Sequence, residues 1–168
     1  MIELIMRLFF YLMPMYVANA SAMLFGGKKR LDMGRQFMGQ PLFGKGKTIE
    51  GTVNGIALGI IATFILNYFF SAYISLGVEY LMLGTLLSVG AIMGDIIATF
   101  IKRRIGMEAG AEFFPLDQLD FIFGGIVFGS FLFVPSLVEI GLIILITLFI
   151  HKAANFLAFK IRMKKVPW

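Results

Sequence analysis

Long apolar segments constrain this chain more than any other feature of its sequence. Each has roughly the length that crosses a bilayer as a helix, about 20 residues, and they cover residues 2–25, 53–76, 80–101, 119–134 and 137–159. Hydrophobic residues make up 59% of the 168 residues and charged residues only 15%, a balance that is not typical of soluble domains. We therefore predict an all-α integral membrane protein with five transmembrane helices, in which residues 1–168 form a single domain.

Three of these apolar runs need a closer reading. The first contains Arg7 and Pro14, but no small-residue cleavage motif follows it, so we interpret it as a retained span and not as a signal peptide. The fourth and fifth runs are separated only by VPSLVE, where Pro135 blocks a helical hydrogen bond and Ser136 can cap the next helix. These features favour a tight hairpin, and one bent re-entrant segment is the alternative.

The basic residues predict the orientation of the helices. They concentrate in residues 26–50, in Lys102 to Arg104 and after His151, whereas the hairpins that contain Glu79 and Glu139 have no Lys or Arg. Cytoplasmic loops carry the excess of Lys and Arg in membrane proteins. We therefore expect a multi-pass protein of the cell membrane with its N-terminus outside, its C-terminus inside and two long cytoplasmic loops at about residues 26–52 and 102–117.

Three carboxylates lie close to the predicted cytoplasmic boundary. Asp95 is seven residues before Lys102, which places it roughly 10 Å into the membrane, and intramembrane acids commonly line a site or pathway. Asp117 and Asp120 are spaced i, i+3 and share one face at the start of the fourth helix. Paired oxygen ligands suit Mg²⁺ better than zinc. The structural alternatives are an Asp95 bonded to Asn19, Asn54 or the backbone, and Asp117 as a simple helix cap.

Polar and basic groups near these acids suggest phosphate chemistry. Lys47 and Thr48 follow a glycine-rich loop that could contact phosphate, although the loop lacks the glycine spacing of a Walker A motif. The triplet from Lys102 to Arg104 ends the third helix, where membrane anchoring is the alternative role. His151 and Asn155 are spaced i, i+4 near the end of the last helix, where they could reach phosphate or base or bond to each other. The absence of Cys excludes thiolate catalysis and disulfides.

Three sequence blocks resemble the CDP-lipid synthases, membrane enzymes that transfer a cytidylyl group from CTP to a lipid phosphate. KTIEG at residues 47–51 is similar to the KTxEG element of the bacterial CDP-diacylglycerol synthases, and GDIIATFIKR at 94–103 resembles GDxxxSxxKR, with Thr99 in the Ser position. PLDQLD at 115–120 resembles the end of their aspartate-containing motif, with Gln118 in place of Arg. The short chain, YVANA near its start and HKAAN near its end are more similar to the archaeal branch of the family, the CDP-archaeol synthases.

This resemblance implies a reaction, its partners and a set of site residues. CTP and an isoprenoid glycerol phosphate lipid would react in the membrane with Mg²⁺ as cofactor, by in-line attack of the lipid phosphate; no nucleic-acid partner is expected and no oligomeric state is predicted. The candidate catalytic residues are Asp95, Lys102, Asp117 and Asp120, and the candidate metal ligands are Asp117, Asp120 and Asp95. Asp95 could instead orient Lys102. The candidates for binding substrate are Asn19, Lys47, Thr48, Thr99, Lys102, Arg103, Arg104, Gln118, His151 and Asn155.

Two other functional classes fit parts of the pattern. A small ion-coupled transporter would use a pathway centred on Asp95, but the predicted outer halves of the helices hold few polar residues to continue it. Transfer of a phospholipid group from a CDP-lipid to an alcohol would need more carboxylates than the cytoplasmic face offers. The cytidylyltransferase is therefore the favoured prediction.

Overall fold

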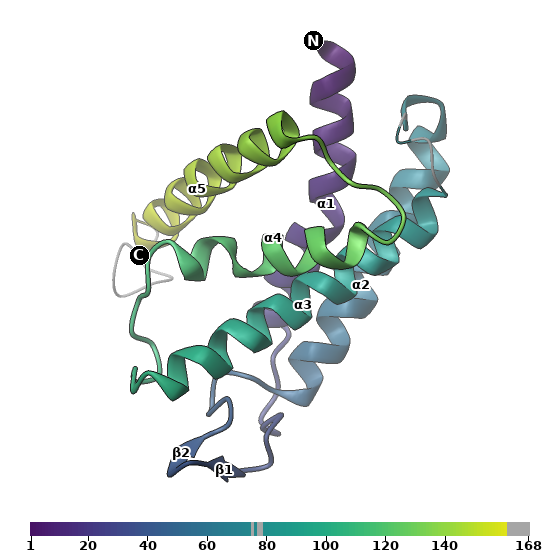
Figure 1. Ribbon diagram of the computed structural model, residues 1–168. Helices are drawn as coiled ribbons and strands as arrows, with labels where there is room; N and C mark the ends of the chain where they lie inside the picture. Colours follow the sequence, from purple (N-terminus) through teal and green to yellow (C-terminus); the bar gives the residue numbers. More distant parts are fainter. Residues whose placement is uncertain (75, 77–78, 161–168) are drawn as a thin grey trace.

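The described part of the chain contains five α-helices, with one short β-hairpin between the first and second (Figure 1). The computed structural model describes residues 1–74, 76 and 79–160, except for the side chains of residues 154, 155 and 157–159. The elements in chain order are α1 (Ile2–Leu24), β1 (Gln36–Phe37), β2 (Gln40–Pro41), α2 (Ile49–Phe70), the 3₁₀ turn η1 (Ser71–Tyr73), α3 (Tyr80–Arg104), α4 (Leu116–Gly129) and α5 (Leu137–Lys160).

The helix ends show where local signals refine the apolar pattern. Thr48 caps α2, so that helix begins four residues before the apolar run at residue 53. α4 ends at Gly129, earlier than the predicted residue 134. The backbone N–H groups of residues 130–133 donate to the last carbonyls of the helix and form a turn there. Ser136 accepts a hydrogen bond from the backbone N–H of Glu139 at 3.3 Å, as predicted for a cap of α5.

Three of the helices have the length and composition of membrane spans. Among the described residues these are Ile2–Leu24, Ile49–Tyr73 and Tyr80–Arg104. α4 has 14 residues, which is about 21 Å of helix and shorter than a hydrocarbon core of about 30 Å. The chain is thus an all-helical membrane protein, and the five-span topology remains a prediction.

Glycines let the helices approach each other closely. A Cβ on Gly94 of α3 would lie 2.2 Å from the backbone oxygen of Asp120 in α4, and a Cβ on Gly55 of α2 would lie 2.8 Å from the backbone oxygen of Ala18 in α1. Only glycine permits such contact between helix backbones, a common device of membrane helices. The packing fixes α3 against α4 and α1 against α2.

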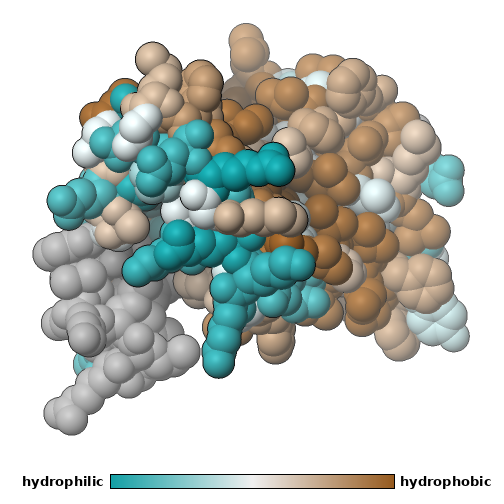
Figure 2. All heavy atoms as spheres, turned by 90° about the horizontal axis from the view of Figure 1, so that it is seen from below, coloured by the Kyte–Doolittle hydropathy of each residue, from teal (hydrophilic) through white to brown (hydrophobic). Residues whose placement is uncertain are grey.

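The long loop between α1 and α2 folds around two side chains. Asp32 is buried and accepts hydrogen bonds from the backbone N–H groups of Gly34 (2.9 Å), Phe43 (3.1 Å) and Gly44 (2.8 Å). Arg104, at the end of α3, donates to backbone oxygens of the β-hairpin, including that of Gln40 at 3.3 Å. Figure 1 shows the hairpin at the end of the bundle where α3 ends and α2 begins. Seen from this end, hydrophilic side chains gather on part of the surface and hydrophobic side chains cover much of the rest (Figure 2).

Candidate functional site

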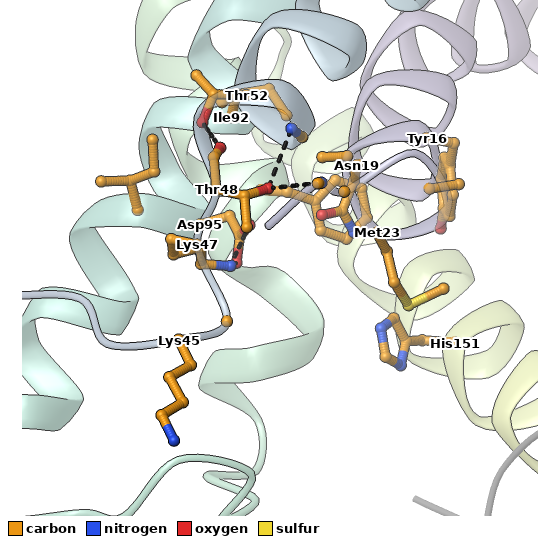
Figure 3. A pocket seen from close by; sticks show the side chains of 18 of the residues that line it. Tyr16, Asn19, Met23, Lys45, Lys47, Thr48, Thr52, Ile92, Asp95 and His151 are labelled. Atoms are coloured by element: carbon orange, nitrogen blue, oxygen red, sulfur yellow. Dashed lines mark hydrogen bonds and ion pairs between the residues drawn. The ribbon is translucent and has the colours of Figure 1, made fainter. Parts of the chain in front are cut away.

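A cavity of about 590 Å³ opens between α1, the start of α2, α3 and α5. Apolar residues and glycines form part of its wall. Its polar lining consists of Tyr16, Asn19, Lys45, Lys47, Thr48, Thr52, Asp95 and His151. Four segments distant in the sequence therefore bring polar side chains to one cavity, and two of them, the loop before α2 and α3, bring opposite charges (Figure 3).

Lys47 and Asp95 form the central ion pair of the cavity. The Lys47 Nζ lies 2.5 Å from both carboxylate oxygens of Asp95, and the two side chains point toward each other in Figure 3. Each side chain is about one-fifth exposed, at 20%. The partner of Asp95 is therefore Lys47, and not Lys102, Asn19 or Asn54 as considered from the sequence.

Thr48 joins the loop to the first turn of α2. Its hydroxyl oxygen accepts hydrogen bonds from the backbone N–H groups of Gly51 at 3.1 Å and Gly27 at 3.3 Å. The first bond is an ordinary helix cap, and the second holds the start of the loop beside it. Thr48 therefore has a structural role that was not predicted, in addition to its place in the cavity wall.

α1 and α5 provide the opposite wall of the cavity. Tyr16, Asn19 and Met23 share one face of α1 because they are spaced i, i+3 and i+7. His151 of α5 lies beyond Met23 in Figure 3. Asn155, the other candidate at this end of α5, has a side chain outside the described residues, so neither of its two possible roles is tested.

Asp120 stands beside this cavity and lines a second one. The second cavity measures about 240 Å³, lies between α3 and α4, and is otherwise lined by apolar residues and glycines. Asp120 is 8% exposed, and its carboxylate accepts a hydrogen bond from the backbone N–H of Phe121 at 2.6 Å. It lies within electrostatic range of Asp95, Lys47 and Asp117. The close contact at Gly94 explains this proximity, because Asp95 is the next residue of α3.

The end of α3 forms a separate ionic cluster that does not line the large cavity. Lys102 is buried and donates to the Asp117 carboxylate at 2.8 and 2.9 Å and to the backbone oxygen of Ala111 at 2.7 Å. Arg103 donates to the backbone oxygen of Met107. Arg104 stacks over the rings of Phe37 and Phe100, with its guanidinium carbon 5.5 and 4.9 Å from the ring centroids.

The remaining predicted residues also have protein partners. Thr99 donates to the backbone oxygen of Asp95 at 2.8 Å, and Gln118 donates through its amide nitrogen to Glu112 at 3.0 Å. Asp117 is not the cap of α4, because that position belongs to Pro115. Its carboxylate instead accepts the backbone N–H of Phe113 at 2.9 Å in addition to Lys102.

Some residues of the site were not singled out from the sequence. Tyr16 and Lys45 line the cavity, and the helical spacing of Tyr16 from Asn19 is a signal that could have found the tyrosine. Asp32 orders the loop that carries Lys45 and Lys47. No local pattern predicts that role, since it depends on backbone N–H groups up to 12 residues away.

The chemistry of the acids fits a hard divalent cation. Among the described residues no group of three or more His, Asp or Glu side chains is arranged to hold a metal ion. Mg²⁺, however, needs only one or two carboxylates when phosphates and water complete its coordination shell. Asp120 is buried, lies near Asp95 and has no ion pair among the described residues. A positive charge beside it would relieve an otherwise costly buried carboxylate.

A membrane helix bundle with a charged cavity at one end is typical of an intramembrane protein, and the cavity is a candidate site for a polar ligand. The family profile described as CarS-like CDP-archaeol synthase matches residues 1–168. The chain belongs to the CDP-archaeol synthase family, which confirms the resemblance found in its motifs and favours an enzyme over a transporter.

Relatives match nearly the whole chain. CDP-archaeol synthase of Methanocaldococcus jannaschii is 40% identical over 167 residues, covering 94% of each chain. CDP-archaeol synthase of Thermococcus onnurineus is 39% identical, covering 95% of each chain. A solved structure described as an intramembrane enzyme for archaeal membrane lipids biosynthesis aligns with a TM-score of 0.79 and 31% identity, covering 87% of this chain and 90% of the other.

Proposed function

We propose that this chain transfers the cytidylyl group of CTP to the phosphate of an isoprenoid glycerol ether lipid, giving CDP-archaeol and pyrophosphate. The observation that carries the proposal is the Lys47–Asp95 ion pair in the wall of a cavity of about 590 Å³. That volume is typical of small-molecule sites. The names of the relatives support the same reaction.

The reaction needs charge stabilisation more than a nucleophilic side chain. A phosphate oxygen of the lipid attacks the α-phosphorus of CTP and forms a new phosphorus–oxygen bond. The bond from the α-phosphorus to the oxygen that bridges it to the β-phosphorus breaks, and pyrophosphate leaves with that oxygen. Lys47 would exchange Asp95 for phosphate oxygens, and the exposed Lys45 would add a second cation.

The other polar groups of the cavity suit the sugar and the base. Asn19 offers an amide, Tyr16 and Thr48 offer hydroxyls, and His151 offers a ring nitrogen, all from the cavity wall. The Lys102–Asp117 pair would hold the loop between α3 and α4 in place through its bond to Ala111. Arg103 and Arg104 would support the site from the same end of α3.

Asp95, Asp117 and Asp120 are the residues that would hold Mg²⁺. Asp120 and Asp95 are the pair beside the cavity, whereas Asp117 is already bound to Lys102. A bound Mg²⁺ would offset the negative charge of the triphosphate as it approaches these acids.

The second cavity suits the hydrocarbon part of the lipid. Its lining is almost entirely apolar, and Asp120 contributes a carboxylate to this wall. A lipid in this groove would carry its phosphate toward the two acids. We further propose the five-span topology in the cell membrane, with the large cavity on the cytoplasmic side, because the basic loop from Lys28 to Lys47 lies at the same end as the cavity.

Synthesis by the purified protein tests the proposal. Protein in detergent is incubated with labelled CTP, Mg²⁺ and the di-geranylgeranyl glycerol phosphate, and the labelled lipid and pyrophosphate are measured. We expect both products in equal amounts, little product with ATP, and a loss of at least about a hundredfold in Asp95→Asn. Glu79→Gln, which changes an exposed acid just before α3, is the control and should retain activity. Absence of labelled lipid from the unaltered protein would refute the proposed reaction.

A further inference from the structure

α5 presents one continuous inward stripe that ends at the cavity. Glu139, Ile143, Thr147 and His151 recur every four residues and so lie on one face of the helix. Glu139 is 6% exposed, Ile143 and Thr147 are fully buried, and His151 lines the cavity. The stripe therefore runs over 12 residues, about 18 Å of helix, from a buried acid to the cavity.

Arg7 of α1 forms an ion pair with Glu139, at the end of this stripe that is farther from the cavity. Its Nη2 lies 3.1 Å from one oxygen of Glu139, and its guanidinium lies over the ring of Phe133 at 5.4 Å. The other oxygen of Glu139 accepts the backbone N–H and the hydroxyl of Ser136, both at 2.8 Å. A buried carboxylate needs such partners, because losing the cation leaves an uncompensated charge.

α5 has few other attachments to the bundle. Over the described residues it contacts α1 and α4 much less extensively than α3 contacts α4 or α1 contacts α2. Figure 1 shows α5 on the outer side of the bundle, away from α2. Its outward face is exposed, as at Leu145 and Phe149. A small number of contacts therefore determines the rotation and tilt of this helix.

We infer that Arg7 and Glu139 are positioning residues for the cavity at the opposite end of α5. The ion pair fixes the rotation of α5, and the helix, as a stiff rod, transmits that rotation to His151. Without Arg7, the Glu139 side chain loses its charged partner and turns toward a more polar environment, and α5 rotates or tilts. The part of this inference that concerns turnover rests on the proposed function, whereas the part that concerns the position of α5 does not.

The position of α5 can be measured without turnover. The chain has no Cys, so Ile101→Cys on α3 and Phe149→Cys on α5, both exposed, provide sites for a spin-label pair. We expect Arg7→Met to broaden or shift the distance distribution between the labels, and Arg7→Lys to keep it. Glu3→Gln, an exposed acid near the start of α1, is the matched control and should change nothing. An unchanged distribution in Arg7→Met would overturn the inference.

Separate experiments deal with a variant that fails to fold and with the question of whether Arg7 acts on CTP binding through His151. If Arg7→Met fails to fold, Glu139→Gln keeps the size of the side chain and an oxygen acceptor for Ser136 while removing the charge that binds Arg7, and it should give the same shift. In the synthesis assay, Arg7→Met should raise the KM for CTP by roughly tenfold with a smaller change in kcat. In a His151→Ala background, Arg7→Met should add little further increase.

The outcomes distinguish the inference from the proposed function. If the double variant raises the KM for CTP by the product of the increases in Arg7→Met and His151→Ala, Arg7 does not act through His151 and the coupling is overturned. An unchanged KM in Arg7→Met would overturn it as well. If the unaltered protein makes no CDP-lipid, the proposed function fails, and the distance measurement still decides whether Arg7 and Glu139 position α5.

Discussion

Asp32 is the residue on which the order of the large loop depends. Burial acts to raise the pKa of its carboxyl, but the N–H groups of Gly44, Gly34 and Phe43 and the charge of Arg30 outweigh burial and hold the pKa below its ordinary value of 3.8. A carboxylate whose pKa is depressed on folding stabilises the folded state above its unfolded pKa. That contribution is lost as the pH falls through the lower, folded-state pKa.

Replacing this carboxylate should therefore give a pH-dependent loss of stability. We expect Asp32→Asn to lower the free energy of unfolding by roughly 1 to 3 kcal/mol at pH 7, because two or more backbone donors lose a charged acceptor. The difference should begin to shrink as the pH falls below 3.8, the ordinary pKa of this carboxyl, and should vanish only below the lower pKa of the folded state, where the unaltered side chain is protonated as well. Melting temperatures at pH 7 and pH 3 measure this, with Glu108→Gln, an exposed loop acid, as control. A difference that widens on acidification would contradict the assignment.

At the level of elements, the contact between α3 and α4 sets the distance between Asp95 and Asp120. Gly94 meets the backbone of Asp120 directly, so any side chain at this position must push the two helices apart. The same contact separates the large polar cavity from the apolar groove. The arrangement of acids in the site is thus a consequence of backbone packing between two helices.

Gly94→Ala should destabilise the protein and weaken the site together. Overpacking of this kind typically costs about 1 to 3 kcal/mol, and displacement of Asp120 should reduce CDP-lipid synthesis by more than the loss of folded protein explains. Gly141→Ala in α5 is the matched control, since a Cβ there meets no atom within 4 Å. Equal melting temperatures and activities for the two alanine variants would show that the helices do not depend on this contact.

For the whole molecule, the first question is which end faces the cytoplasm. We expect a single cysteine at Lys28 to be labelled by an impermeant reagent only after the membrane is opened, and one at Ser136 to be labelled from outside. The expectation follows from the basic residues in the loop between α1 and α2 and from the absence of Lys and Arg in the connection between α4 and α5. Labelling of position 28 in intact cells would reverse the orientation and place the cavity on the outside.

Binding of nucleotide and metal should stabilise the entire fold. CTP with Mg²⁺ would place compensating charge between the acids and Lys47, and a hundredfold excess over the Kd contributes about 2.7 kcal/mol if only the folded state binds. CTP alone should raise the melting temperature less than CTP with Mg²⁺. Asp95→Asn should reduce the additional rise in melting temperature that Mg²⁺ causes. Equal stabilisation by ATP would argue against a site selective for cytosine, and no shift at all would argue against nucleotide binding at this cavity.

The amino-acid pattern by itself determined the membrane class, the approximate extent of the helices and the family. Hydropathy is local, so a run such as residues 80–101 identifies α3 without knowledge of its neighbours. Helix caps are local too, as at Ser136. The KTIEG, GDIIATFIKR and PLDQLD blocks identified the family because they are contiguous and in order.

Only the tertiary structure decided which charged groups are partners. Lys47 and Asp95 are 48 residues apart and meet because α2 and α3 pack in one bundle. Arg104 and Lys102 were predicted as candidates for binding substrate, and the structure gives them protein partners, the carbonyls of the β-hairpin for Arg104 and Asp117 for Lys102. The physical reason is that a charge can pair with any opposite charge within reach, and reach depends on helix packing, which glycine contacts such as Gly94 with Asp120 determine at atomic distances.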